Sequence, residues 1–326
     1  MKTQLTKRTA ALCLAAALAL SVNAAALFGS VEKAQPGAGA PTAQALEIRT
    51  YRGIPYRAQF LAASSAGDAL TYAVEEAPEK GTVQIEGDHF TYTPEENASG
   101  TDRFTYTATD ASGQVSQPAE VRVTIEKAKS GVTYADIGDS AAAVAAQDLA
   151  EAGIFTGAKI GDQYYFEPDK TVSRSEFLAM VLETAGETPT AVTMTGFCDD
   201  EAIPTWAKAY AAAGVAEGLV GGVSTEEGAA FRGEEPITFN QAAAILNRLL
   251  AVEDVDLTAW YADREAAPSW AAQAVANMEA VSVLSAGSFG SAEMGGTVTR
   301  ADAAQMLSAA ATLLEGEPEG LLDRLF

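Results

Sequence analysis

One short segment recurs three times in this chain of 326 residues and constrains its fold more than any other feature. The copies read TVSRSEFLAMV, ITFNQAAAILN and TVTRADAAQML. In each copy a hydroxyl side chain is followed three positions later by an acid or an amide, at Ser173/Glu176, Thr238/Gln241 and Thr299/Asp302. This spacing predicts a capping box, in which the hydroxyl accepts from a backbone amide of the first helical turn and the acid or amide reaches back to the cap.

The helix after each cap is predicted to bury one face. An apolar pair follows every cap at one fixed offset, at Met180/Val181, Ile245/Leu246 and Met306/Leu307. Because the offset is kept in all three copies, the pattern predicts three amphipathic helices.

The recurring segment belongs to a longer repeated unit. Every unit starts with an aromatic residue, any residue and an aspartate, at Tyr134/Asp136, Phe197/Asp199 and Tyr261/Asp263, so that the starts lie 63 and 64 residues apart. An alanine-rich segment, a loop with an aromatic residue and the capped helix follow. We place unit 1 at 134–186, unit 2 at 197–252 and unit 3 at 261–314, and assign no role to the tail 315–326.

An arginine begins the capped helix in two of the three units. Arg174 and Arg300 occupy this position in units 1 and 3, and unit 2 has Phe239. A cation there opposes the positive end of the helix dipole, so its presence needs a reason. Either the guanidinium and the free amides of the helix bind an anion such as a carboxylate, or the arginine pairs with a neighbouring acid. The residues alone favour neither explanation.

These motifs together resemble the S-layer homology domain. The resemblance rests on the aromatic-x-Asp start, a Trp-Ala pair, a glycine-rich helix end, a Phe/Pro loop and the segment similar to T-R-A-E, and it covers 134–314. It implies an all-α triple repeat, a three-pronged assembly around a central helical bundle, with grooves between the repeats. It also implies that the grooves bind secondary cell-wall polysaccharide, typically carrying a ketal-linked pyruvate, whose carboxylate would contact Arg174 and Arg300.

No unit carries the complete set of family positions, so one or two working grooves are expected rather than three. Trp206 and Trp270 match the Trp-Ala site, whereas unit 1 has Ala141. The helix-ending glycine is Gly153 in unit 1 and Gly218 in unit 2, and unit 3 has Ser282 there.

The other candidate site residues have two interpretations each. Trp206 and Trp270 either stack on a sugar or belong to the core, and the core is favoured. Asp136, Asp199 and Asp263 either hydrogen-bond sugar hydroxyls or cap or brace the first helix of their unit, and the structural role is favoured.

A different pattern precedes the units. Threonines alternate with aromatic residues in HFTYT (89–93) and RFTYT (103–107), and turn residues separate the segments. Short alternating strands at this spacing predict a β-sandwich at 46–127, followed by a linker at 128–133. The sandwich segment also resembles bacterial immunoglobulin-like, cadherin-like modules, which act as spacers or adhesive units.

The N-terminus has the features of an export signal. A basic start, a short apolar run and small residues predict a signal peptide at 1–26, and a flexible leader is predicted at 27–45. No later segment reaches membrane length. We therefore expect a secreted protein without a membrane span. Cys13 would leave with the signal, and Cys198 is predicted to be a small buried side chain rather than a reactive thiol.

Composition argues against several kinds of chemistry. A formal net charge of −23 repels nucleic acid. His89 is the one histidine, and its place at a predicted strand start favours a surface residue over a catalytic base or a ligand, with no second histidine to complete a zinc site. A calcium site formed by Asp88, Asp102 and Asp110 is not supported by the sequence, because these aspartates do not form a D-x-D cluster. We expect no enzyme, no cofactor and no metal.

The sequence thus predicts a multidomain surface protein, an all-β Ig-like sandwich followed by an all-α triple repeat. Its expected function is noncovalent anchoring to the cell wall through pyruvylated, anionic polysaccharide, with other surface proteins as further partners of the sandwich. The alternatives are a structural subunit of an S-layer lattice, and an adhesin or accessory subunit that acts through the sandwich.

Overall fold

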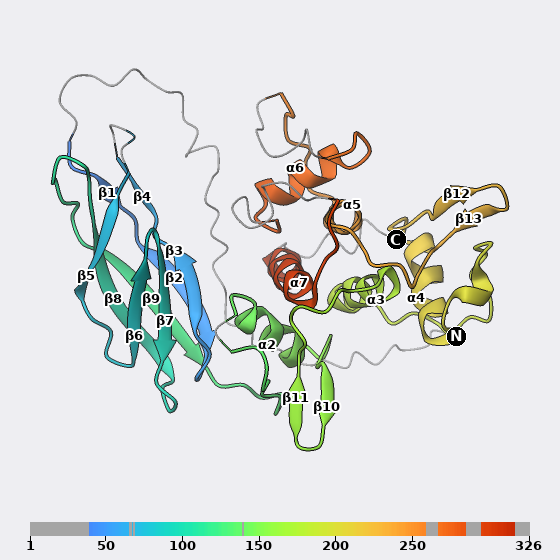
Figure 1. Cartoon of the computed structure of the whole chain (residues 1–326), viewed down its shortest axis with the longest axis horizontal. Coiled ribbons are helices and arrows are strands. Elements are labelled where there is room, and N and C mark those ends of the chain that lie inside the picture. Colours follow the sequence, from blue (N-terminus) through green and yellow to red (C-terminus); the bar gives the residue numbers. More distant parts are fainter. Residues whose placement is uncertain are drawn as a thin grey trace, which may run out of the picture.

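The computed structural model describes residues 39–64, 67, 69–138, 140–258, 267–284 and 295–316. A β-sandwich is followed by a mixed helical region (Figure 1). None of the helices in these ranges is both long and apolar enough to cross a membrane. The predicted signal peptide (1–26), Asp263 and all but the first two residues of the tail lie outside the described residues.

The sandwich consists of two main sheets. The first has the order β2-β9-β8-β5 and consists of β2 (Leu46–Tyr51), β5 (Thr71–Glu76), β8 (Gly100–Thr109) and β9 (Ala119–Glu126). The second has the order β3-β7-β6 and consists of β3 (Tyr56–Gln59), β6 (Gly81–Glu86) and β7 (His89–Pro94). Strands β2 and β9 are parallel, and the other pairs are antiparallel.

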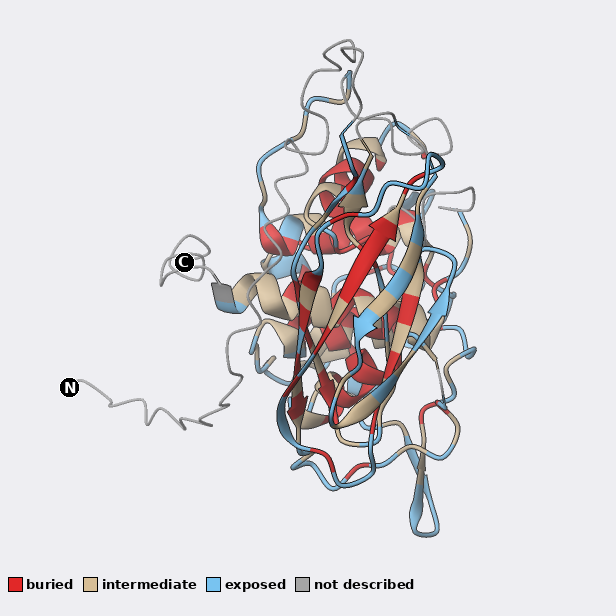
Figure 2. Cartoon of the chain, turned by 90° about the vertical axis from the view of Figure 1, so that its left-hand side faces the viewer, coloured by how far each residue is buried: buried red, intermediate tan, exposed pale blue. Residues whose placement is uncertain are grey.

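The predicted alternation of the strands is confirmed. Phe90 and Tyr92 of β7, and Phe104 and Tyr106 of β8, are all buried between the sheets. Buried positions alternate with more exposed ones along β7 and along β8 from Asp102 to Tyr106, and the buried residues of the sandwich are red in Figure 2. The two tyrosines keep their hydroxyls satisfied, because Tyr92 donates to the Asp102 carboxylate at 2.7 Å and Tyr106 donates to backbone carbonyls.

The sandwich begins earlier than the sequence predicted. Strand β1 (Thr42–Ala43) pairs with β4 (Ala62–Ala63), although residues 42–43 lie in the predicted flexible leader. Backbone hydrogen bonds to β4 order this segment, although its composition alone predicts no regular structure.

The helical region contains six α-helices within the described ranges. These are α2 (Ala143–Glu151), α3 (Arg174–Thr184), α4 (Thr205–Ala216), α5 (Phe239–Leu250), α6 (Ala272–Ala280) and α7 (Arg300–Gly316). A short 3-10 helix, η1, covers Asp200–Ala202. The prediction of an all-α region is wrong, because units 1 and 2 each have a β-hairpin between their two helices. The hairpin of unit 1 pairs β10 (Ala158–Ile160) with β11 (Gln163–Tyr165), and that of unit 2 pairs β12 (Val223–Thr225) with β13 (Gly228–Ala230).

All three predicted capping boxes are present. The hydroxyls of Ser173 and Thr238 accept from the amides of Glu176 and Gln241, whose side chains accept from the cap amides. Thr299 and Asp302 form the same pair of bonds at the start of α7. These contacts span three residues, which explains why the sequence alone located the helix starts.

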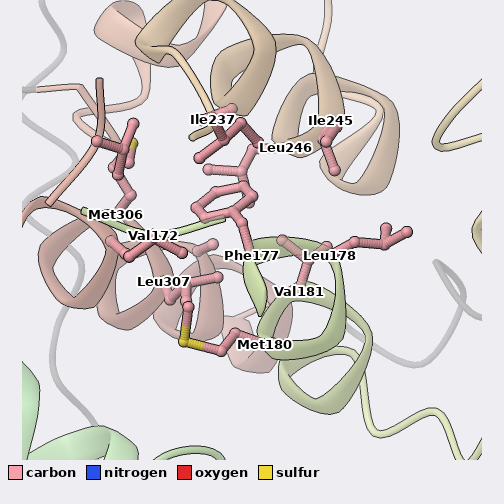
Figure 3. Close-up of a cluster of buried hydrophobic side chains, with 14 of the residues drawn as sticks. Val172, Phe177, Leu178, Met180, Val181, Ile237, Ile245, Leu246, Met306 and Leu307 are labelled. Carbon is pink, nitrogen blue, oxygen red and sulfur yellow. The ribbon is translucent and has the colours of Figure 1, made fainter. Parts of the chain in front are cut away.

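The helices pack in a closed cycle. Helix α4 packs against α3, α6 against α5, and α2 against α7, so the first helix of each unit contacts the second helix of another. The apolar pairs predicted from the sequence are buried together with Phe177, and Figure 3 shows these side chains from α3, α5 and α7 around one centre. The core of the region is therefore shared by the three units.

A ring of backbone hydrogen bonds closes the same cycle. The amide of Val172 donates to Val298, that of Val298 donates to Ile237, and that of Ile237 donates to Val172, each at 2.9 Å. Each of these buried residues lies directly before a helix cap. The three units are therefore joined head to tail, with each capped helix placed beside a loop of the next unit.

The linker predicted at 128–133 is bound to the helical region. Glu151, at the end of α2, accepts from the amide of Lys129 at 2.7 Å and from the amide of Ser130 at 3.0 Å. The sandwich and the helical region are thus connected by more than the covalent chain.

Candidate anion-binding site

Each capped helix begins against a loop of the next unit. The amides of Arg174 and Ser175 donate at 2.9 Å to the carbonyls of Glu235 and Gly233 in unit 2. The amides of Arg300 and Ala301 donate in the same way to the carbonyls of Lys170 and Pro168 in unit 1. Of the two explanations for the arginines, the one in which free helix amides help to bind an anion does not hold in this form, because these amides already have partners. Only the arginine side chain remains available for that purpose.

The shared geometry of these loops depends on two aspartates. Asp136 accepts from the amides of Phe166 and Glu167, and Asp199 accepts from the amides of Phe231 and Arg232. Glu167 and Arg232 have the same positive φ of 56°, which a carboxylate that binds two successive amides can hold in place.

The two aspartates are therefore structural, as favoured, but they brace the loop before the second helix. The first helices α2 and α4 begin without a side-chain cap, so the prediction that the aspartates cap or brace them is wrong. The paired bonds also identify equivalent positions in the two loops. Phe166 corresponds to Phe231, and Glu167 corresponds to Arg232.

The Arg174 side chain lies at the junction of units 1 and 2. Its guanidinium carbon is 5.6 Å from the centre of the Phe231 ring, in a cation–π arrangement. Within the described ranges its guanidinium makes no hydrogen bond or ion pair, and its Nε is buried without a partner. We call this arrangement the Arg174 site, and it comprises Arg174, Phe231, Arg232, Glu235 and Arg248.

Other arginines make the Arg174 site cationic. Burial lowers the pKa of Arg174, and the Arg248 guanidinium lowers it further, against the opposite effect of Glu235. Arg248 donates to the carbonyl of Leu219 at 2.8 Å, and Arg232 lies 3.9 Å from the Glu235 carboxylate. A partly desolvated guanidinium without a counterion is a favourable site for a carboxylate.

Arg300 lies in the equivalent place at the junction of units 3 and 1, but its charge is neutralised. Its Nη1 donates to the Glu167 carboxylate at 2.6 Å and to the carbonyl of Phe166 at 3.0 Å, and its guanidinium carbon is 5.0 Å from the Phe155 ring. We call this arrangement the Arg300 site, and it comprises Arg300, Phe155, Phe166 and Glu167. Pairing with a neighbouring acid therefore explains Arg300 but not Arg174.

The third junction has no arginine at this position. Phe239 begins α5 there, and it packs partly buried against the shared core. The equivalent cation is missing, as the sequence predicted.

Trp206 and Trp270 are not core residues. They are 51% and 60% exposed, so the favoured interpretation is wrong. On α4 the buried positions are small, at Ala207, Ala211 and Gly214, and Trp206 instead makes an edge contact with Tyr210. Both indoles are accessible for stacking on a sugar.

Two further polar groups were missed by the sequence analysis. Ser175 and Asn240 occupy equivalent positions on α3 and α5, and both are almost completely buried. The Oγ of Ser175 and the Oδ1 of Asn240 have no hydrogen-bond partner in the described part of the chain. The sequence signal for them is a polar residue at the second helical position of units 1 and 2, where unit 3 has Ala301.

Other candidates for chemistry are accounted for by local contacts. No group of three or more histidine, cysteine or acidic residues among the described residues is arranged to hold a metal ion. The Asp102 carboxylate accepts from Tyr92 and three amides, and Asp110 binds its own turn. His89 contacts Asp88, and Cys198 is exposed, so the prediction that it is buried is wrong.

Comparison with solved structures gives only local similarities. An endo-fucoidan hydrolase of glycoside hydrolase family 107 is 22% identical over 28% of this chain, with a TM-score of 0.24. The chain spans 14% of the length of that hydrolase. A mutant SrpA adhesin from Streptococcus sanguinis is 16% identical over 31% of this chain and 65% of its own, with a TM-score of 0.23. Titin domain M7 is 10% identical over 28% of this chain and 99% of its own, with a TM-score of 0.19.

The sequence comparisons concern the first domain. Among curated proteins, none matches this chain. Residues 38–126 match the family described as a bacterial Ig domain, which supports the assignment of the β-sandwich as an Ig-like module.

Proposed function

We propose that the helical region is a triple S-layer homology repeat that anchors a secreted protein to the bacterial cell wall without catalysis. The ligand would be an anionic secondary cell-wall polysaccharide, with a pyruvate ketal as its charged group. The Ig-like sandwich would extend from the wall and remain available to other surface proteins.

One observation carries this proposal. The Arg174 guanidinium is partly desolvated, stands above an aromatic ring and makes no ion pair with a described residue. An uncompensated cation of this kind is unfavourable in the free protein, and a carboxylate ligand would remove the penalty. The exposed Trp206 and Trp270 could add stacking contacts to sugar rings.

The proposal is tested by sedimentation of the chain with purified Gram-positive cell walls. The whole chain is used because the sandwich and linker contact α2. We expect the protein to pellet with intact walls and to stay in the supernatant after the secondary polymer is extracted by acid. Walls that carry the polymer without its pyruvate should bind weakly. Equal pelleting with stripped and intact walls would exclude polysaccharide recognition.

A further inference from the structure

The Arg174 and Arg300 sites are built on equivalent loops that carry opposite charges at two positions, Glu167/Arg232 and Lys170/Glu235. The loop residue held by Asp136 is Glu167 in unit 1, and the loop residue held by Asp199 is Arg232 in unit 2. Both have the same φ of 56°, and the loops around them make matching hydrogen bonds to the aspartate and to the next helix start. The difference between the sites is therefore a difference of side chain.

Glu167 provides Arg300 with a carboxylate from the same protein. Its Oε2 lies 2.6 Å from Nη1 of Arg300, and it also lies 3.3 Å from Nζ of Lys170. The Arg300 side chain is 11% exposed, whereas Glu167 is 46% exposed. The carboxylate thus approaches the buried guanidinium from the solvent side, which is the side from which a ligand would come.

In the Arg174 site no side chain takes this role. Arg232 replaces Glu167. Glu235 raises the pKa of Arg174 through its charge, but it lies 3.9 Å from Arg232 and makes no ion pair with Arg174. A guanidinium at position 232 cannot neutralise a second guanidinium. The site therefore keeps its positive charge.

We propose that Glu167 is a built-in carboxylate that occupies the Arg300 site in place of ligand, so that the chain has one open anion site, at Arg174. This inference rests on the proposed function for the nature of the ligand. Position 167/232 then determines which junction binds, with an acid closing a site and a cation leaving it open.

The test measures the number of sites by isothermal titration calorimetry with a synthetic pyruvate-ketal hexoside as the probe. We expect the unmodified chain to bind one equivalent, and Glu167→Gln to bind two. The second equivalent should disappear in Glu167→Gln/Arg300→Ala. The reverse change, Arg232→Glu, should supply Arg174 with an internal partner and reduce binding at least tenfold. Glu86→Gln serves as the control, because it removes an exposed carboxylate from the sandwich.

The outcomes separate this inference from the proposed function. One equivalent for both the unmodified chain and Glu167→Gln would overturn the role of Glu167 and leave the anchor proposal standing. No binding by the unmodified chain, with one Arg300-dependent equivalent for Glu167→Gln, would overturn the anchor proposal and the open site at Arg174 and leave only the role of Glu167 standing. No binding by either protein would reject both. Circular dichroism melting of each variant shows that a lost site is not a lost fold.

Discussion

The Arg49 guanidinium in the sandwich lies 2.8 Å from the Asp148 carboxylate on α2, and the two residues are 99 positions apart in the chain. Tyr51 donates to the same carboxylate oxygen at 2.8 Å, and Ser308 of α7 donates to the other oxygen. Burial alone would lower the pKa of Arg49, but Asp148 raises it above its usual value. Asp148 therefore joins the sandwich, unit 1 and unit 3 at one point.

The equivalent positions on the other first helices show that this contact is specific to unit 1. Ala213 on α4 and Asn277 on α6 correspond to Asp148, as the shared hydrogen bonds at the helix ends indicate. Asn277 contacts Asn247 of α5, just as Asp148 contacts Ser308 of α7. Only Asp148 adds a negative charge, and this charge lies where the sandwich presents Arg49.

Replacing Asp148 with alanine should uncouple the sandwich from the helical region. The change leaves a largely buried arginine without its counterion, which costs about 3–5 kcal/mol. Differential scanning calorimetry should show two separate transitions in place of a single one, and X-ray scattering should show a larger maximum dimension. Ser308→Ala is the matched control. It removes one neutral hydrogen-bond donor, should cost about 1 kcal/mol and should keep a single transition.

Arg174→Ala should weaken attachment to walls without loss of stability. A charge-assisted contact contributes about 1.5–3 kcal/mol, which corresponds to roughly 10- to 150-fold in affinity. Quantitative pelleting at several protein concentrations measures the change. Arg300→Ala should leave affinity within about twofold and lower stability instead, since Arg300 already binds Glu167 and Phe166. Attachment that survives Arg174→Ala unchanged would remove the basis of the anchor proposal.

Asp199→Ala should affect both stability and binding. The amides of Phe231 and Arg232 lose their acceptor, so we expect a loss of about 2 kcal/mol in urea unfolding. Because the same loop carries the ring under Arg174, wall affinity should fall as well. Asp136→Ala provides the comparison, as it removes the equivalent bonds in unit 1 and should destabilise to a similar extent with little effect on affinity.

Two glycines with similar backbone angles should differ in their tolerance of alanine. Gly222 has a φ of 74°, and a Cβ there would lie 2.7 Å from the Phe197 ring and 3.0 Å from the carbonyl of Ala230. Gly153 has a φ of 75°, but no atom lies within 4 Å of the position that a Cβ would take there. We expect Gly153→Ala to cost about 1 kcal/mol of backbone strain and Gly222→Ala at least about 3 kcal/mol. If chemical denaturation gave equal losses of unfolding free energy for the two variants, the expected clash of a Cβ at position 222 with Phe197 and Ala230 would be contradicted.

The stability of the sandwich should depend on pH through Asp102. Burial raises the pKa of its carboxyl, but hydrogen bonds from Tyr92 and from the amides of Lys80, Glu79 and Arg103 outweigh burial and lower the pKa below its usual value. The stabilisation is therefore fully present above the unfolded pKa of about 4 and is lost as the pH falls through the lower folded value. Urea unfolding between pH 6 and pH 2 should show this loss. Asp102→Asn should make the profile flatter, and an unchanged slope would contradict the role of this carboxylate.

The sequence by itself determined the local elements of this protein. A capping box joins atoms three residues apart, and the apolar residues of an amphipathic helix recur every three or four residues. Both signals are local, so Ser173, Thr238 and Thr299 located three helices correctly. Alternation placed Phe90 and Tyr92 on one buried face for the same reason. In the capped helices and in the strands alike, the signal comes from residues that are close together in the sequence.

Only the tertiary structure decided which charges have partners. Glu167 and Arg300 are 133 positions apart, and they meet because the ring of units places the start of α7 beside the loop of unit 1. The same ring places Arg174 over the Phe231 ring and within reach of the Arg248 charge, so two arginines with the same local sequence pattern have different electrostatic surroundings. The ion pairing of a side chain depends on distance in space, and the closed packing of the three units sets that distance.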